Sequence, residues 1–430
     1  MVARRALVNF WSIHWSKIYM AKLTNVGLFD SGRSIIVQRW TVIVQKLVIS
    51  WSIRWSIFHL LVMAMLIALL PLCWVWLRYA QESTLRRIQL LTWMTLFLTF
   101  DLVMFGAFTR LTDSGLGCPD WPGCYGTSNP WHAISEIQQA EASMPTGPVT
   151  VIKAWIEMIH RYLAMTVGAL ILIQVAVAWS KLRSLGKKPL LGSLGLLILV
   201  CIQGAFGAWT VTLKLQPIIV TIHLMLALVL LACLTTYAQQ DWIGKSSSAI
   251  RLQSKPLSAK LLLLAAVILC IQIFLGAWVS TNYAVLACPD FPTCMDRLWP
   301  ETAWQEGFTL WRGLGLNAQG ESITPVALQT IHWAHRVFAM VAVVVLGALG
   351  MSALSLGDAK SLGMGRIAKL LLGLLILQAL TGISNVVFQW PLLAALMHTA
   401  GSAALVFCLV RLVQWSSWAT PIHIKMSKSL

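Results

Sequence analysis

Charged residues are scarce in this sequence. Of its 430 residues, 11% are Asp, Glu, Lys or Arg, whereas 58% are hydrophobic and the mean hydropathy is +0.75. A soluble protein of this length would not bury so much apolar surface, so the composition excludes an ordinary soluble domain and indicates a polytopic membrane protein. Windows of about 20 apolar residues predict eight spans near 90–109, 152–178, 190–209, 217–237, 261–280, 326–350, 367–387 and 391–413. A further apolar segment lies near 57–77.

Acidic residues are scarcer still: 15 Asp and Glu stand against 32 Lys and Arg, which gives a net charge of +17. The basic residues collect in loops of one parity, as at 181–188, whereas loops 110–150 and 281–325 are poor in Lys and carry nine acidic residues. The positive-inside rule then places both ends of the eight-span unit in the cytoplasm and the two long loops outside. The basicity therefore reports membrane topology, and no nucleic-acid partner is predicted.

The N-terminal region lacks a short apolar core followed by a small-residue cleavage site, so a cleaved signal peptide is not expected. Residues 1–56 are instead basic and rich in Trp-Ser pairs. If segment 57–77 spans the membrane, these cations lie outside, against the rule. Two explanations stay open: a later translation start, for instance at Met63, which we favour, or a basic, Trp-rich surface segment.

The two halves of the eight-span region repeat each other. The sequence CPDWPGC at 118–124 returns as CPDFPTC at 288–294, and 63 residues separate His160 from His223 as well as His335 from His398. Each repeat has four spans, so both halves enter the membrane in the same direction and should be related by a twofold axis along the membrane normal. The predicted fold is an all-α polytopic membrane protein with two pseudo-twofold-related four-helix bundles and an extra N-terminal span.

This organisation divides the chain into six parts. They are the basic Trp-rich region 1–56, the extra span and cytoplasmic linker 57–89, the N-terminal bundle 90–240, a cytoplasmic linker 241–260, the C-terminal bundle 261–415 and a cytoplasmic tail 416–430.

The four paired histidines are the strongest functional signal. Each falls 7–10 residues into a predicted span that runs from outside to inside, about 10–15 Å below the outer surface at 1.5 Å per residue. Two histidines at matching depth on neighbouring helices of one bundle can face each other across a haem, whose iron takes axial histidine. The alternative is that the imidazoles only hydrogen bond between helices. A zinc or copper site is less favoured, because no Cys or carboxylate repeats at ligand spacing in both halves.

Arginine follows one histidine of each pair directly, as Arg161 and Arg336. A guanidinium near the outer part of a bundle suits bidentate pairing with haem propionates; snorkelling towards the membrane surface is the alternative.

The repeat is broken at Glu157, which lies one helical turn outside His160 and corresponds to His332 in the second half. A carboxylate at this depth costs about 3 kcal/mol to insert if it is unpaired. Either it forms a structural salt bridge, to Arg110 or Arg161, or the first bundle performs chemistry while the second only carries electrons.

The nine cysteines divide into two groups. Five lie in apolar spans, where a small buried hydrophobe is the default interpretation. The pairs Cys118/Cys124 and Cys288/Cys294 lie in the outer loops, where disulfides are expected in an oxidising compartment. A redox-active role for the first pair stays open.

At these residues the chain resembles the haem A synthase family. The matching elements are GAFTRLTDSGLGCPDWPGCYG at 106–126, EMIHR at 157–161, His223, HWAHR at 332–336 and His398. The resemblance implies a membrane enzyme that oxidises the C8 methyl of haem O to a formyl group, giving haem A for cytochrome oxidase.

Carried over by position, the resemblance implies that His335 and His398 ligate a resident haem b, while His160 and His223 bracket the substrate haem O with Glu157 essential beside it. Cys118 and Cys124 match the external disulfide of the family. The resemblance further suggests a bacterial-type inner membrane with periplasmic Cys loops, and haem O synthase and an electron acceptor or donor as partners.

Without the resemblance, the leading hypothesis is a dihaem cytochrome b-type electron carrier such as a quinol oxidoreductase. It predicts two similar haems and no need for Glu157. A haem or lipid transporter is the third class, and it predicts a pocket open to both membrane faces.

Overall fold

A computed structural model describes residues 58–239, 257–356 and 362–418, and the predictions for 1–56, most of the 241–260 linker and most of the tail lie outside these residues. Within them the chain is helical and forms no β-strand. Nine described helices are long and apolar enough to cross a membrane. The prediction of an all-α polytopic membrane protein is confirmed.

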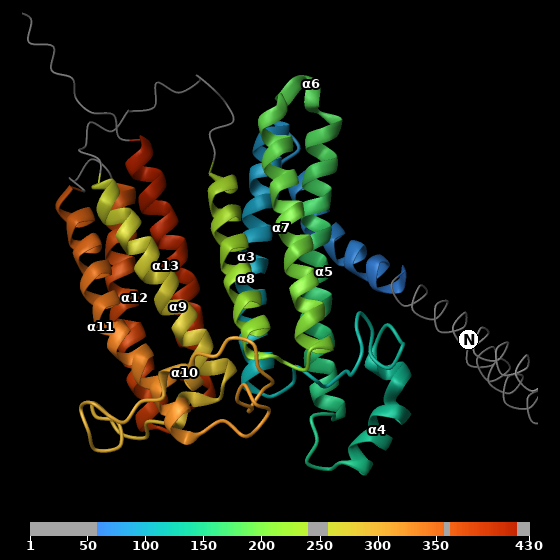
Figure 1. The fold of residues 1–430 in the computed structure, drawn as a ribbon. Coiled ribbons are helices and arrows are strands. Elements are labelled where there is room, and N and C mark those ends of the chain that lie inside the picture. Colours follow the sequence, from blue (N-terminus) through green and yellow to red (C-terminus); the bar gives the residue numbers. More distant parts are fainter. Residues whose placement is uncertain (1–57, 240–256, 357–361, 419–430) are drawn as a thin grey trace, which may run out of the picture. The chain divides into compact units, whose positions relative to one another are not determined.

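The helices follow the predicted order (Figure 1). The first half contains α3 Thr84–Leu111, α5 Val151–Ser180, α7 Lys187–Thr212 and α8 Pro217–Ala238, and the second contains α9 Ala259–Thr281, α11 Pro325–Leu356, α12 Leu362–Val387 and α13 Leu392–Trp418. Short elements lie between them: η1 Pro130–Ala133, α4 Ile134–Ser143, α6 Leu182–Leu185, η2 Ala284–Leu286 and α10 Trp304–Gly307. Sequence patterning did not predict these short elements, because they are too brief to produce an apolar window of spanning length.

Local sequence sets several helix starts. The side chains of Ser83, Thr150 and Ser258 accept hydrogen bonds from the backbone N–H three residues on, at the starts of α3, α5 and α9. Such caps satisfy N–H groups that have no partner inside the helix. Pro217 and Pro325 begin α8 and α11, where a missing N–H costs nothing.

Each half packs its four long helices in a ring. In the first half α3 contacts α5 and α8, while α7 contacts the same two helices; in the second, α9 contacts α11 and α13, while α12 contacts the same two. The halves meet where α8 packs against α13. Two further contacts join them, one between α3 and α13 and one between α8 and α9. The last two contacts are equivalent under exchange of the halves, as a twofold relationship requires.

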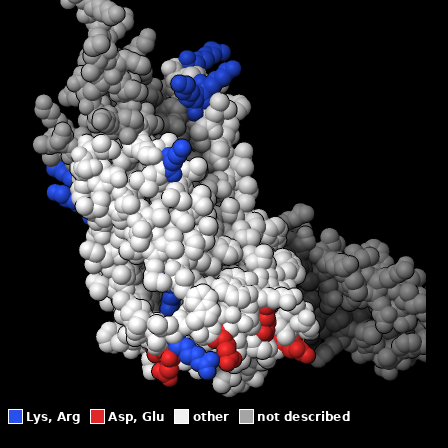
Figure 2. Space-filling model, turned by 60° about the vertical axis from the view of Figure 1, so that its left-hand side comes forward, with Lys and Arg blue, Asp and Glu red and all other residues white. Residues whose placement is uncertain are grey.

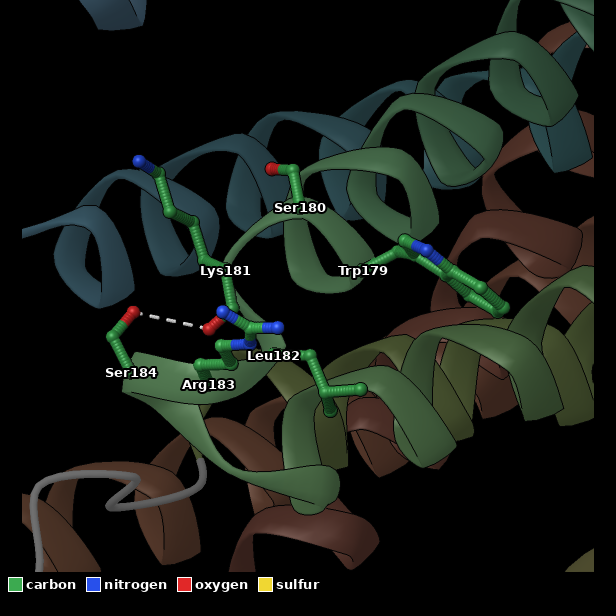
Figure 3. A pocket seen from close by; sticks show the side chains of 6 residues that line it. All are labelled: Trp179, Ser180, Lys181, Leu182, Arg183 and Ser184. Carbon is green, nitrogen blue, oxygen red and sulfur yellow. Dashed lines mark hydrogen bonds between the residues drawn. The ribbon is translucent and has the colours of Figure 1, made fainter.

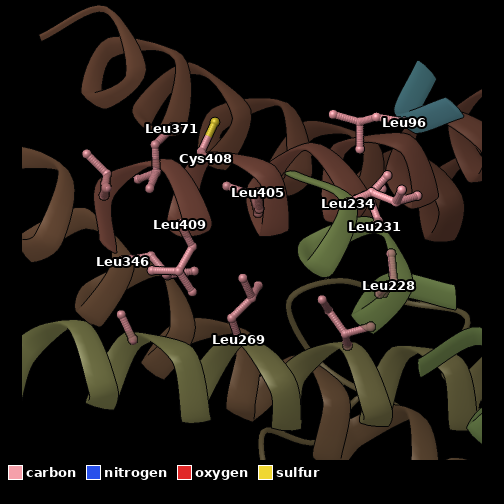
Figure 4. Close-up of a cluster of buried hydrophobic side chains, with 14 of the residues drawn as sticks. Leu96, Leu228, Leu231, Leu234, Leu269, Leu346, Leu371, Leu405, Cys408 and Leu409 are labelled. Carbon is pink, nitrogen blue, oxygen red and sulfur yellow. The ribbon is translucent and has the colours of Figure 1, made fainter. Parts of the chain in front are cut away.

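A leucine-rich core joins the two rings. Leu231 and Leu234 of α8 belong to the same buried cluster as Leu269 of α9 and Leu409 of α13 (Figure 4). Polar side chains add cross-links: the amide of Gln174 on α5 hydrogen bonds Thr92 and Thr95 of α3. Such bonds hold helices together where lipid supplies no hydrophobic driving force.

The segment predicted near 57–77 forms the helix Phe58–Arg78. Its Ala64 and Ala68 pack on α3 and α5 in a buried cluster. Near its start Leu60 is buried with Cys118 of the outer loop, and near its end Trp76 lies 5.9 Å from the guanidinium of Arg87. The helix therefore runs the length of the first bundle.

Charge is distributed as the topology requires. Figure 2 shows only basic side chains at one end of the described helices, whereas the acidic ones on this face gather at the other. α6 lies at the basic end, and α4 and α10 lie at the end that carries the two long loops (Figure 1).

Candidate functional site

The four histidines lie at similar depth. They occupy α5, α8, α11 and α13, between six and ten residues after the start of each helix, which is about 9–15 Å from the outer end. His160 and His223 belong to the first ring, and His335 and His398 to the second. The expectation that partners sit on neighbouring helices is wrong, because the histidine helices alternate around each ring with α3, α7, α9 and α12. The partners face each other diagonally across the bundle.

The second pair has the spacing of two ligands on one metal. The ring centres of His335 and His398 are 6.4 Å apart, with the rings inclined at 80°. Metal–imidazole bonds are about 2 Å long, so two imidazoles on opposite sides of one iron have centres roughly 6 Å apart. The observed separation matches.

Each imidazole packs edge-on against a glycine of the intervening helix. A Cβ atom built on Gly106, Gly207, Gly276 or Gly382 would lie 3.0, 3.1, 2.9 or 3.4 Å from Cε1 of His160, His223, His335 or His398, respectively. At Gly106, Gly207 and Gly276 these distances are too short for an ordinary Cβ contact, so the absence of a side chain lets the ring approach, whereas 3.4 Å at Gly382 is an ordinary contact. The sequence alone did not identify the role of these glycines, which depends on which helix each one faces.

Hydrogen bonds reinforce the positions of His223 and His398. Gln203 donates to the backbone carbonyl of His223 at 3.0 Å, and Gln378 donates to that of His398 at 2.8 Å. The Thr381 hydroxyl lies 2.9 Å from Nδ1 of His398. A partner on Nδ1 leaves Nε2 to ligate a metal, as is usual for metal-bound histidine.

These residues fit haem. In the described part of the chain, no group of three or more His, Cys, Asp or Glu side chains could hold a metal ion, so two imidazoles are all that each site offers. A zinc site needs more protein ligands, whereas haem brings its own macrocycle and requires only axial ones. Nδ1 of His160 and of His223 are buried without a hydrogen-bond partner among the described residues, so the first pair retains unused donor or acceptor capacity.

Glu157 lies directly under the first outer loop. Its Oε2 accepts a hydrogen bond from the backbone N–H of Cys118 at 2.8 Å, and its Oε1 accepts one from Arg161. The residue is 4% exposed. Of the two arginines considered as partners, Arg161 forms the salt bridge, whereas Arg110 pairs with Asp113.

The two halves make the same contact with different groups. Arg336 donates to Nε2 of His332 at 3.1 Å, just as Arg161 donates to Glu157. Both guanidinium groups also reach up to the disulfide loops: Arg161 donates to the carbonyls of Asp120 and Gly123, and Arg336 donates to the carbonyls of Cys288, Asp290 and Thr293. Their contact with haem propionates stays a prediction.

The outer loops are closed as expected from the sequence. Disulfides join Cys118 to Cys124 and Cys288 to Cys294. An aspartate inside each loop braces it: Asp120 accepts from the N–H of Tyr125 and Gly126, and Asp290 accepts from the N–H of Met295 and Asp296. Sequence reasoning missed this role, although the repeated Cys-Pro-Asp triplet signals it.

A hollow of about 430 Å³ lies at the turn between α5 and α7, lined by Trp179, Ser180, Lys181, Leu182, Arg183 and Ser184 (Figure 3). It is about 20 residues, or roughly 30 Å, along α5 from His160. This hollow is therefore separate from the histidine sites.

Comparison with known proteins agrees with this geometry. The family model described as "Cytochrome oxidase assembly protein" matches residues 89–410. A protein of Shewanella oneidensis named "Heme A synthase" is 37% identical over 328 residues, which cover 74% of this chain and 94% of that protein. Proteins of the same name from Beijerinckia indica and Caulobacter vibrioides are 30% and 28% identical, covering 75% and 72% of this chain and 90% of each relative. This chain belongs to the cytochrome oxidase assembly protein family.

Proposed function

We propose that this protein is a haem A synthase, a membrane-bound oxidoreductase that converts the C8 methyl of haem O into a formyl group. The observation that carries the proposal is the pair of equivalent bis-histidine sites, of which only one has a carboxylate beside it. Two electron-carrying haems would not require this difference. The names of the relatives point the same way.

The two sites then have different tasks. His160 and His223 hold the substrate haem O, and His335 and His398 hold a resident haem b. Bound haem supplies the redox chemistry, because its iron passes single electrons. The apolar helices around both pairs suit a substrate with a long hydrocarbon tail.

Glu157 acts on protons at the first site. The Cys118 N–H and Arg161 hold its carboxylate one helical turn outside His160. Each carboxylate oxygen has two lone pairs, so these bonds leave room to accept protons released as the methyl carbon is oxidised. Arg161 and the disulfide loop fix the position of the carboxylate.

The charge distribution supports a proposed orientation in the membrane. The basic end faces the cytoplasm and the disulfide loops face the outer side of a bacterial cell membrane. An electron acceptor or donor and haem O synthase are the proposed partners.

The proposal is tested by extracting haems from membranes that contain haem O and this chain. We expect haem A with the wild type and its loss in Glu157→Gln, which keeps an oxygen for the Cys118 N–H but loses the charge. The control Glu136→Gln changes an exposed carboxylate of α4 and should retain haem A. Unchanged haem b and haem O in cells with the wild type would contradict the proposal and favour the electron carrier.

A further inference from the structure

Three of the four glycines that face a histidine have a glutamine one turn earlier on the same helix. These pairs are Gln203 with Gly207, Gln272 with Gly276 and Gln378 with Gly382. Residues four apart share a helix face, so the glutamine and the glycine meet the same histidine. In the fourth helix, α3, Leu102 stands in this place before Gly106.

Each glutamine fixes a histidine from the side. All three amides donate to the backbone carbonyl of the histidine opposite, at 3.0 Å for His223, 3.4 Å for His335 and 2.8 Å for His398. The Gln272 amide nitrogen also lies 3.2 Å from Nδ1 of His335, which leaves Nε2 of that ring for a metal. The Gln203 amide nitrogen lies 3.4 Å from Nε2 of His223, so the support that Gln203 gives a metal-bound His223 is its bond to the backbone carbonyl. At His398 the Thr381 hydroxyl makes the ring contact instead.

His160 is supported differently. The Leu102 side chain offers no hydrogen-bonding group, so the amide that the other three histidines receive at their backbone carbonyls is missing here. Nδ1 of His160, like that of His223, is buried without a partner in the described chain. The ring is stacked on Phe105 instead, with centres 6.4 Å apart and planes inclined by 8°. Hydrogen bonds are directional and fix the orientation of a ring more strictly than stacking and close packing do.

We infer that Gln203, Gln272 and Gln378 are positioning residues for their histidines, and that Leu102 leaves His160 as the ligand free to turn away from the iron. The inference rests on the proposed function, in which one haem must enter and leave the first site in every cycle while the other stays. A site with both ligands held suits the resident haem, and a site with one free ligand suits exchange.

Two reciprocal variants test this. Leu102→Gln installs the missing amide, and Gln272→Leu removes the amide at the equivalent place in the second half. Leu102→Met is the matched control, since methionine is close to glutamine in length and shape but is apolar and has no donor. Purified protein loaded with haem is mixed with an excess of a soluble haem-binding acceptor, and haem loss from each site is followed by its low-spin absorption and electron paramagnetic resonance signals.

We expect Leu102→Gln to slow haem loss from the first site about tenfold, the effect of one hydrogen bond, while the second site is unchanged. Gln272→Leu should speed loss from the second site by a similar factor, and Leu102→Met should match the wild type. Equal loss rates in wild type and Leu102→Gln would overturn the inference. If Leu102→Gln does not fold, an unchanged rate of haem loss from the second site of Gln272→Leu would overturn the inference.

The haem extraction described above distinguishes this inference from the function. Asymmetric haem loss without any haem A in the extract would refute the synthase but keep the assignment of Leu102. Haem A in the extract together with unchanged rates of haem loss from both sites would support the synthase and refute the assignment of Leu102.

Discussion

Asp113 and Tyr283 occupy equivalent positions in the two halves, 170 residues apart, and the Tyr283 hydroxyl donates a hydrogen bond to the Asp113 carboxylate at 2.5 Å. A second contact of the same kind joins Arg110 to the backbone carbonyl of Ser280, also 170 residues apart. Two equivalent positions can touch each other only near the axis that relates them. The twofold axis of the molecule therefore passes through this cluster at the outer ends of α3 and α9.

This cluster should stabilise the junction of the two halves. We expect Tyr283→Phe to lower the free energy of unfolding by about 1 kcal/mol, because it removes one hydrogen bond from a partly exposed site. Thermal unfolding in detergent measures the effect. Tyr79→Phe, which removes a hydroxyl at the opposite end of the first bundle, is the control and should change the unfolding temperature less. Equal shifts in the unfolding temperature of both variants would show that the Tyr283–Asp113 hydrogen bond does not stabilise the junction.

The sequence predicted the spans because a membrane helix needs a long apolar run, and it predicted the duplication because loop and histidine motifs repeat at nearly constant offset. It offered Arg161 as a possible partner of Glu157, which the structure confirms, but it did not predict that Arg161 and Arg336 also bind loop carbonyls. Both guanidinium groups donate to carbonyls of the disulfide loops, and their contact with haem propionates stays a prediction. Which group lies within reach depends on how the loop folds back over the helix end, and helical periodicity carries no information on that.

The glycines that face the histidines should differ in their tolerance of alanine. The closest approach to a new Cβ is 2.9 Å at Gly276 and the most distant is 3.4 Å at Gly382. Gly276→Ala should therefore displace His335 and weaken the low-spin haem spectrum, at a cost of about 1–3 kcal/mol for overpacking, while Gly382→Ala is better tolerated. Gly204→Ala on α7 is the control, because nothing lies within 4 Å of its Cβ. A larger effect at Gly204 than at Gly276 would contradict the assignment.

The exchange of Glu157 and His332 between the halves separates the structural role of this position from its chemical role. Glu157→His gives Arg161 the partner that Arg336 already has, so the first outer loop should stay folded and its disulfide should still form. Haem A production should nevertheless be lost, because the carboxylate is gone. Disulfide mapping checks the fold of the loop, and haem extraction from the same preparation checks the loss of haem A. His332→Glu is the reciprocal control and should retain haem A, whereas activity in Glu157→His would show that an imidazole suffices.

The second outer loop should loosen in acid. Burial alone would raise the pKa of the Asp290 carboxyl, but hydrogen bonds from the Thr293 hydroxyl and from two backbone N–H groups outweigh it and hold this pKa below its usual range. A carboxyl whose pKa is lowered by folding stabilises the loop above its unfolded pKa, and that stabilisation is lost as the pH falls through the lower, folded value. Hydrogen exchange at Met295 and Asp296, corrected for the intrinsic pH dependence, should rise in this range. Thr293→Val removes one of the bonds and should move the transition to higher pH, whereas an unchanged midpoint would show that Asp290 does not brace the loop.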